Sequence, residues 1–97
     1  MESTDKRYFI ILNDEVKKQI QSFRKSGNIP AIKKIQQLIN ELEVHPYTGT
    51  GKPEALKYNL SGFWSRRIDS KNRMIYSIEE NIITVEILSA KGHYSDK

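Results

Sequence analysis

Hydrophobic residues recur at two different spacings near the start of this chain, and each spacing predicts a different element. The run YFIIL at residues 8–12 is short, nearly continuous and rich in strand-favouring side chains, which predicts a strand buried on both faces. Beyond it, Val16, Ile20 and Phe23 recur at helical intervals with polar residues between them. That pattern predicts an amphipathic helix whose apolar stripe faces a core.

Two helices are expected, and each is bounded by residues that commonly begin or end helices. Asn13 or Asp14 can cap the first helix, and Gly27 ends it. Pro30 fits the first turn of the second helix. The apolar stripe of that helix consists of Ile32, Ile35, Leu38, Ile39 and Leu42 and ends before the dipeptide HP at 45–46. Because few residues join the helices, they are expected to pack as an antiparallel hairpin.

After Pro46 the helical spacing disappears. Residues 47–62 contain several glycines and a proline, and we predict that they are mostly loop. Three strand-like segments follow, at 63–68, 73–79 and 82–90, separated by the short turns DSKN and EN. Short connections of this kind predict an antiparallel meander.

The order of elements predicts an α+β fold with the sequence β-α-α-β-β-β, an antiparallel sheet and the helical hairpin on one face. A chain of 97 residues is expected to form a single domain, 1–97, with residues 1–6 as a disordered polar tail. Alternation along the strands points the apolar residues Met74, Tyr76 and Ile78 toward the helices. The same alternation places Arg67 and Arg73 together on the uncovered face.

Composition narrows the possible functions without choosing one. The formal net charge is +4 and the pI is about 9.4, so a polyanionic partner such as nucleic acid is plausible, but many small basic proteins bind none. The absence of cysteine excludes disulfides and thiol chemistry. No apolar run approaches the roughly 20 residues of a membrane span, and the first residues lack the core of a signal peptide. We therefore expect a cytoplasmic protein with no membrane contact.

Polar residues near the expected open face supply a candidate site. The loop contributes Lys52, Glu54 and Lys57, and the end of the chain contributes Lys91, His93 and Tyr94. The two histidines, at 45 and 93, do not have a metal-ligand spacing, and the stretch GTGKPE lacks the spacing of a phosphate-binding glycine loop. No metal and no cofactor are expected.

These residue types fit cleavage of the RNA backbone, because RNA carries its own nucleophile, the 2′-OH. Glu54 could act as general base, Arg73 could stabilise charge on the phosphorus, and His93 could protonate the leaving 5′ oxygen. Each residue also has a simpler interpretation. Glu54 could be a surface acid paired with a neighbouring lysine, Arg73 an ordinary exposed strand residue, and His93 a solvated histidine.

Three stretches together carry a family resemblance: GKPEALKYNLSGFWSRRI at 51–68, RMIYSI at 73–78, and HY at 93–94. With them, the chain closely resembles the YoeB/Txe family of toxins in the RelE superfamily, specifically from Pro46 to Tyr94. The resemblance implies the RelE/ParE-like fold and the toxic half of a toxin–antitoxin pair. The implied activity is a ribosome-dependent endoribonuclease (an mRNA interferase) that cuts translated mRNA in the decoding site and leaves a 2′,3′-cyclic phosphate or 3′-phosphate and a 5′-OH.

The resemblance also implies a role for each matching residue. Glu54 becomes the general base, Arg73 the transition-state clamp, His93 the general acid and Tyr94 a supporting or stacking residue. Contacts to the RNA backbone are implied for Lys57 and Arg67, and the neighbouring cations Lys52 and Lys91 are expected to assist them. The implied partners are an acidic antitoxin similar to YefM or Axe and mRNA on the 70S ribosome, and a homodimer is one state that the resemblance allows.

The chain departs from the family pattern at its end, because Ser95, Asp96 and Lys97 follow Tyr94. Any role for a terminal carboxylate beside the site is therefore in doubt. Two other functions stay open at this point. One is a gyrase-inhibiting toxin of the ParE type, against which the Glu54, Arg73 and His93 set argues, and the other is a non-catalytic RNA- or DNA-binding module.

Overall fold

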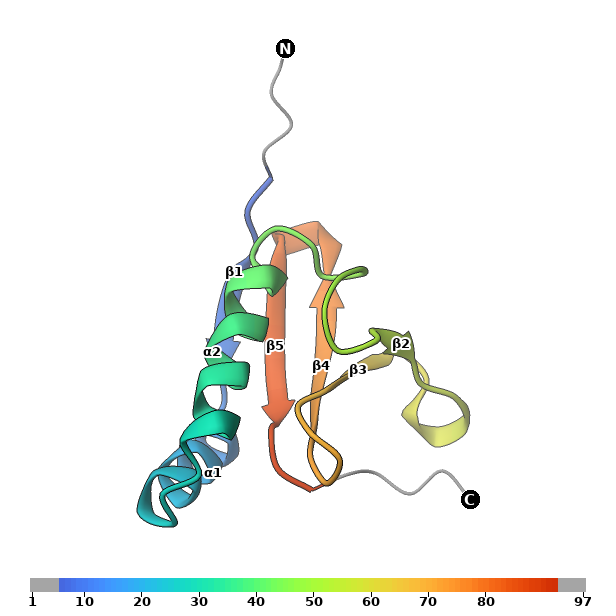
Figure 1. The fold of residues 1–97 in the computed structure, drawn as a ribbon. Helices are drawn as coiled ribbons and strands as arrows, with labels where there is room; N and C mark the ends of the chain where they lie inside the picture. The colour runs from blue at the N-terminus through green and yellow to red at the C-terminus, as the bar shows by residue number, and fades with distance from the viewer. Residues whose placement is uncertain (1–5, 93–97) are drawn as a thin grey trace.

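A five-stranded sheet with two helices on one face forms the framework of the chain in the computed structural model, which describes residues 6–92 (Figure 1). The helices and strands are β1 (Phe9–Leu12), α1 (Asp14–Lys25), α2 (Ile29–Leu42), β2 (Glu54–Ala55), β3 (Phe63–Arg67), β4 (Arg73–Glu79) and β5 (Thr84–Ser89). Short 3-10 turns lie at Tyr58–Leu60 and Glu80–Ile82. The predicted α+β class and the helical hairpin are confirmed.

Both helices begin at asparagine caps. The side chain of Asn13 accepts a hydrogen bond of 2.9 Å from the backbone N of Val16, and that of Asn28 accepts one of 3.2 Å from Ala31. These bonds satisfy amide groups that have no partner within the first turn of a helix. Pro30 lies in the first turn of α2, as predicted, and α1 ends shortly before Gly27, where φ is +74°.

The sheet has the strand order β1-β5-β4-β3-β2. β3, β4 and β5 form the predicted antiparallel meander, but β1 runs parallel to β5, with Phe9 opposite Thr84 and Leu12 opposite Ile87. The sheet is therefore mixed and not antiparallel throughout. β4 occupies one edge of β5, so β1 pairs with the other edge of that strand.

β1 is an edge strand, and the prediction that both its faces are buried is wrong. Ile10 and Leu12 pack against the core, whereas Phe9 is 71% exposed and Ile11 is 49% exposed. The helices cover only one face of the sheet, so alternate residues of β1 point away from them. An almost continuous apolar run thus lies half in the core and half on the surface.

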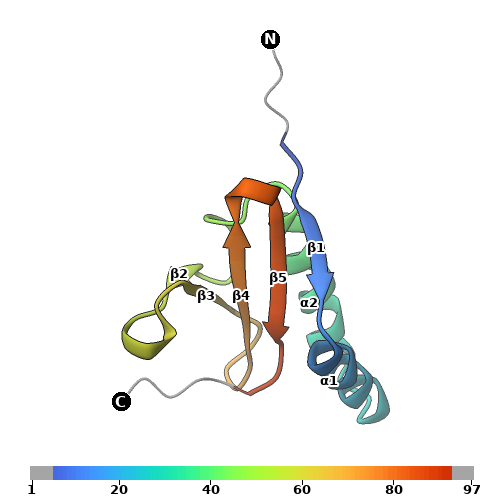
Figure 2. The same ribbon diagram turned by 180° about the vertical axis from the view of Figure 1, so that it is seen from behind.

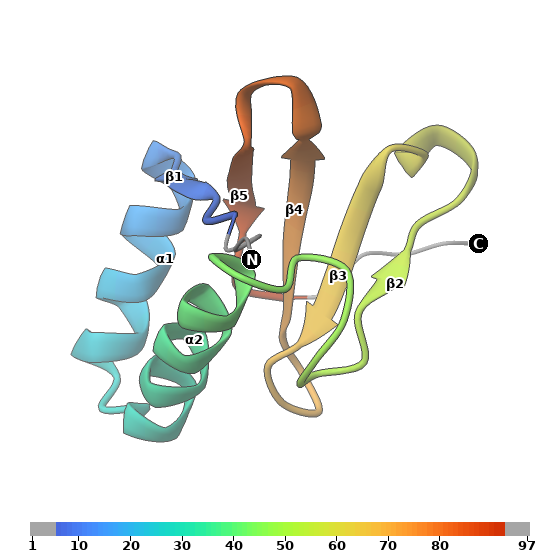
Figure 3. The ribbon, with the colours of Figure 1, turned by 90° about the horizontal axis from the view of Figure 1, so that it is seen from above.

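The core lies between the helices and the sheet, and Met74 and Tyr76 are fully buried there, as the alternation along the strand predicted. Figure 2 shows the side of the molecule opposite to that of Figure 1, and Figure 3 shows both helices on the side of β1 and β5. β2 and β3 lie away from the helices in that view. Within residues 6–92, neither helix is long and apolar enough to cross a membrane.

Candidate functional site

Arg67 and Arg73 lie directly opposite each other in the antiparallel pairing of β3 with β4. Their neighbours in sequence, Arg66 and Met74, are also paired and are fully buried on the helix side. Because side chains alternate along a strand, Arg67 and Arg73 both point to the face away from the helices. This arrangement confirms the predicted position of the two arginines.

Glu54 reaches the same face from β2, a two-residue strand that the sequence pattern predicted to be loop. β2 pairs antiparallel with β3, and Glu54 lies opposite Ser65. Glu54 Oε1 lies 3.9 Å from Arg73 Nη1, and the two side chains are 57% and 25% exposed. An ion pair this long and this exposed to water is weak. This contact alone therefore holds the two side chains together only loosely.

A buried arginine holds the loop that leads into β2. The Arg66 side chain has no exposed surface, and its Nη1 lies 3.0 Å from Oε1 of Glu41 on α2. Its Nε donates a hydrogen bond of 3.1 Å to the hydroxyl of Tyr76. The remaining guanidinium N–H groups donate to the backbone carbonyls of His45, Thr48 and Thr50. One side chain thus fixes three carbonyl groups of residues 45–50.

Glu41 completes this anchor from the other side. Its Oε1 accepts a hydrogen bond of 2.9 Å from the backbone N of Thr50. Burial raises the pKa of Glu41, but hydrogen bonds from Thr50 and Gln37 and the charge of Arg66 outweigh burial, so its pKa lies below the usual value. Glu41 is therefore held as a carboxylate at neutral pH.

Gly51 joins the loop to the end of β3. Its carbonyl accepts a hydrogen bond of 2.6 Å from the backbone N of Arg67, and its φ is +86°. A Cβ atom at this position would lie 2.8 Å from the carbonyl oxygen of Arg67. Only glycine combines this backbone conformation with so close an approach. The contact brings residues 52–54 beside the arginines of the sheet.

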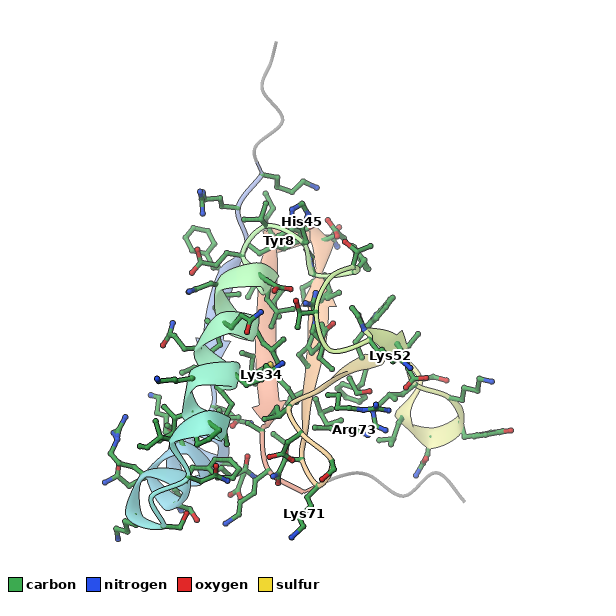
Figure 4. All side chains as sticks on the ribbon, in the orientation of Figure 1. Tyr8, Lys34, His45, Lys52, Lys71 and Arg73 are labelled. Carbon is green, nitrogen blue, oxygen red and sulfur yellow. The ribbon has the colours of Figure 1, made fainter. Side chains whose placement is uncertain are left out.

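The other predicted cations are distributed unevenly around this cluster. Lys52 and Lys57 are both exposed and flank β2, and Figure 4 shows Lys52 and Arg73 on the β2 side of the molecule. Lys91 does not join them, because its Nζ lies 2.7 Å from Oγ of Ser22 and 5.5 Å from the ring centroid of Phe23. Both partners belong to α1, so Lys91 points toward the helix side of the sheet.

Gly92, the last residue that the structure describes, lies beside Arg73. The backbone N of Arg73 donates a hydrogen bond of 2.8 Å to the carbonyl of Gly92, and the N of Gly92 donates one of 2.8 Å to Oδ1 of Asn72. His93 and Tyr94, the predicted acid and its neighbour, lie outside the described residues. Among residues 6–92, no group of three histidine, aspartate or glutamate side chains is arranged to hold a metal ion.

Comparison with known proteins assigns the chain to a family. Residues 6–94 match the model of the YoeB-like toxin of bacterial type II toxin–antitoxin systems. The chain belongs to this family. It is 44% identical over 63 residues to toxin YoeB of Escherichia coli K12, an alignment that covers 65% of this chain and 73% of the relative.

Solved structures of the family share the fold of this toxin. The YoeB/ParE toxin from Agrobacterium tumefaciens superimposes with a TM-score of 0.82 at 27% identity, covering 89% of this chain and 99% of the other. The YoeB dimer from Staphylococcus aureus gives 0.78 at 31% identity, and the YoeB–YefM complex of that organism gives 0.75 at 34%. Each of these two covers 91% of this chain and 99% of the other.

Sequence reasoning about this YoeB-like toxin missed Arg66, although a signal was present. The alternation that directs Arg67 outward also directs Arg66 into the core, and a charged residue at an inward position requires buried partners. Those partners are Glu41 and the loop carbonyls. Arg66 therefore supports the candidate site from the helix side of the sheet, while Arg67 lies on the open face opposite Arg73.

A second anchor holds the start of the same loop. The Tyr47 hydroxyl donates a hydrogen bond of 2.5 Å to Oε2 of Glu80, which also accepts one of 2.7 Å from Tyr8. The bond to Glu80 raises the pKa of Tyr47 to about 12. The Tyr47 ring packs edge-on against Trp64, at 5.4 Å between centroids. The loop that leads to β2 is thus held at its start by the contacts of Tyr47 and at its end by the hydrogen bond between Gly51 and Arg67.

Proposed function

We propose that this toxin is a ribosome-dependent endoribonuclease that cleaves translated mRNA in the decoding site. The observation that supports it best is the meeting of Glu54 and Arg73 across β3, with Arg67 directly opposite Arg73. A carboxylate and two guanidinium groups on one open face provide a proton acceptor beside a phosphate-binding site. Membership of the toxin family supports the same function.

The proposed reaction is a transesterification. Hydrolysis of its cyclic phosphate product follows slowly or not at all. Glu54 takes the proton of the 2′-OH as its oxygen forms a bond to the neighbouring phosphorus. Arg73 stabilises the additional negative charge on the phosphoryl oxygens. The bond from phosphorus to the 5′ oxygen breaks, and His93 supplies the proton that this oxygen needs. The products are a 2′,3′-cyclic phosphate, or the 3′-phosphate formed from it, and a 5′-OH.

The remaining candidate residues are proposed to hold the RNA. Arg67 lies opposite Arg73, and the exposed Lys52 and Lys57 flank β2, so that all three are proposed to contact phosphates on either side of the cleaved bond. Tyr94 is proposed to support or stack on a base. Lys91 is also proposed as an RNA contact, although its position against α1 places it outside the arginine cluster.

The proposed partners follow from the charge of the protein and from its relatives. The chain carries a net charge of +4, which an acidic antitoxin segment can neutralise. YoeB of S. aureus has been solved as a dimer and in complex with YefM. We propose a YefM-like antitoxin for this toxin, a homodimer as one of its states, and the cytoplasm, where translating ribosomes are present, as its location.

The test is cleavage of a defined mRNA on programmed 70S ribosomes, with the ends of the products mapped. The wild-type toxin should cut in the decoding site and leave a 5′-OH, Glu54→Gln should lose most of this activity, and added antitoxin should abolish it. A parallel supercoiling assay tests the gyrase-inhibiting alternative. Inhibition of gyrase without any cleavage would overturn the proposal, and RNA binding without cleavage would favour the non-catalytic module.

A further inference from the structure

Ser65 carries a buried hydroxyl for which the residues of the described chain offer no hydrogen-bond partner. The residue has no exposed surface, and its Oγ is the one buried side-chain polar atom without a partner in that part of the protein. Burying a hydroxyl without a hydrogen bond destabilises a protein, so such groups are rare and call for an explanation. An alanine would fill nearly the same space without this cost.

The position of Ser65 places its hydroxyl within the proposed site. Ser65 lies directly opposite Glu54 on β2 and directly opposite Ile75 on β4. It is two residues from Arg67 on the same strand, so both side chains point to the same face. Paired residues of this kind have Cβ atoms about 4.5–5.5 Å apart, a distance that a glutamate side chain readily spans.

The ion pair between Glu54 and Arg73 crosses the strand that carries Ser65, on the face to which the Ser65 side chain points. β2 and β4 flank β3, so a contact between Glu54 and Arg73 must cross β3. The β3 residues beneath the crossing are Ser65, opposite Glu54, and Arg67, opposite Arg73. Position 65 is therefore the β3 position directly beside Glu54, on the face where the ion pair forms.

We propose that Ser65 is a positioning residue for Glu54, an inference that rests on the proposed function. When an RNA phosphate binds the guanidinium of Arg73, the carboxylate of Glu54 loses its cationic partner. The hydroxyl of Ser65 then donates a hydrogen bond to that carboxylate and holds it over β3, toward the 2′-OH. The unpartnered hydroxyl of the free protein thus acquires its partner in the substrate complex.

The decisive variant is Ser65→Ala, compared with wild type in single-turnover cleavage on mRNA-programmed ribosomes. The rate at saturation should fall about tenfold or more, as expected for loss of a hydrogen bond to a charged group. The half-saturating concentration should stay within about twofold, because Ser65 does not hold the RNA. The melting temperature should be unchanged or higher, since the variant removes an unsatisfied polar group.

Two further variants separate positioning from a general packing effect. Ser77→Ala removes a half-buried hydroxyl from the same face of β4, opposite Phe63 and remote from Glu54, and should leave the rate unchanged. In a Glu54→Gln background, Ser65→Ala should cause no further loss, because the group that it positions is gone.

The possible outcomes distinguish this inference from the function on which it rests. An equal rate for Ser65→Ala and wild type, or a full additional loss in the Glu54→Gln background, would overturn the role of Ser65 and leave the nuclease intact. A lowered melting temperature that accounts for the lost activity would make Ser65 a packing residue. Absence of cleavage by the wild-type toxin would instead overturn the proposed function itself.

Discussion

Arg66 and Arg67 are neighbours in sequence and point to opposite faces of β3, so that Arg66 is fully buried and Arg67 is exposed. The buried guanidinium contacts Glu41, Tyr76 and the loop before β2. The exposed one lies opposite Arg73. Two identical side chains thus lie in opposite environments, one within the core and one on the open face of the sheet.

Arg66→Met should destabilise the protein strongly, whereas Arg67→Met should change stability by less than about 0.5 kcal/mol. Removing one partner of a buried ion pair typically costs on the order of 3 kcal/mol, which is roughly 12–24 °C in Tm for a domain of this size. Thermal unfolding of the two variants beside wild type measures both effects. Equal melting temperatures for the two variants would contradict the anchoring role of Arg66.

The Glu41–Arg66 pair should also give the toxin a stability that declines in acid. The pKa of Glu41 is lowered in the folded protein, so its contribution is complete above the usual value of 4.5 and is lost as the pH falls through the lowered pKa. Glu41→Gln should therefore cost about 1–2 kcal/mol near neutral pH and much less at about pH 3. Urea unfolding at both pH values tests this. A difference from wild type that stays constant with pH would rule out the charge of Glu41 as its cause.

Arg73→Ala should lower the single-turnover rate by about 10²–10³-fold, because the lost contact is strongest in the transition state. Binding to ribosomes should weaken far less. Lys71→Ala, on the exposed turn before β4, is the matched control and should cleave like wild type. If Arg73→Ala instead binds ribosomes poorly and cleaves normally once bound, Arg73 is a docking residue.

His93→Gln should reduce cleavage by about 10²-fold or more if His93 is the general acid. Glutamine keeps a hydrogen-bond donor but cannot transfer a proton. An RNA in which sulfur replaces the leaving 5′ oxygen needs no proton, so the deficit of the variant should largely disappear on that substrate. A deficit of the same size on both substrates would show that His93 positions RNA only.

Cleavage should proceed without a divalent metal at the catalytic centre, because the 2′-OH is the nucleophile and the proposed groups are all side chains. Ribosomes themselves need magnesium, so the measurement uses a short RNA at high toxin concentration in EDTA. Slow cleavage should persist there. Its complete loss, with recovery on adding a metal, would contradict the metal-independent mechanism.

The helices and the meander could be predicted from the sequence because their signals are local. The asparagine caps, the helical stripes and the period of two each lie within a few residues, and that period placed Arg67 beside Arg73. β2 has only two residues, too few to show a period, and it exists because Glu54 and Ala55 pair with β3. Pairing between segments distant in sequence leaves no local pattern.

Two other features depend on distant contacts in the same way. The direction of β1 is set by its pairing with β5, which the apolar run at residues 8–12 does not encode. The direction of the Lys91 side chain is set by Ser22 and Phe23 of α1. A flexible side chain near the end of the last strand can reach either side of the sheet, so its position could be learned only from the folded chain.

The internal position of β5 has a consequence for how the protein is made. Among the described strands β5 is synthesised last, yet it lies between β4 and β1, and β1 pairs with no other described strand. A nascent chain therefore cannot complete its sheet until residue 89 has been translated and has emerged. If the toxin cuts mRNAs during translation, its own message is among the targets, and fragments that end before β5 would lack the strand that joins the two parts of the sheet.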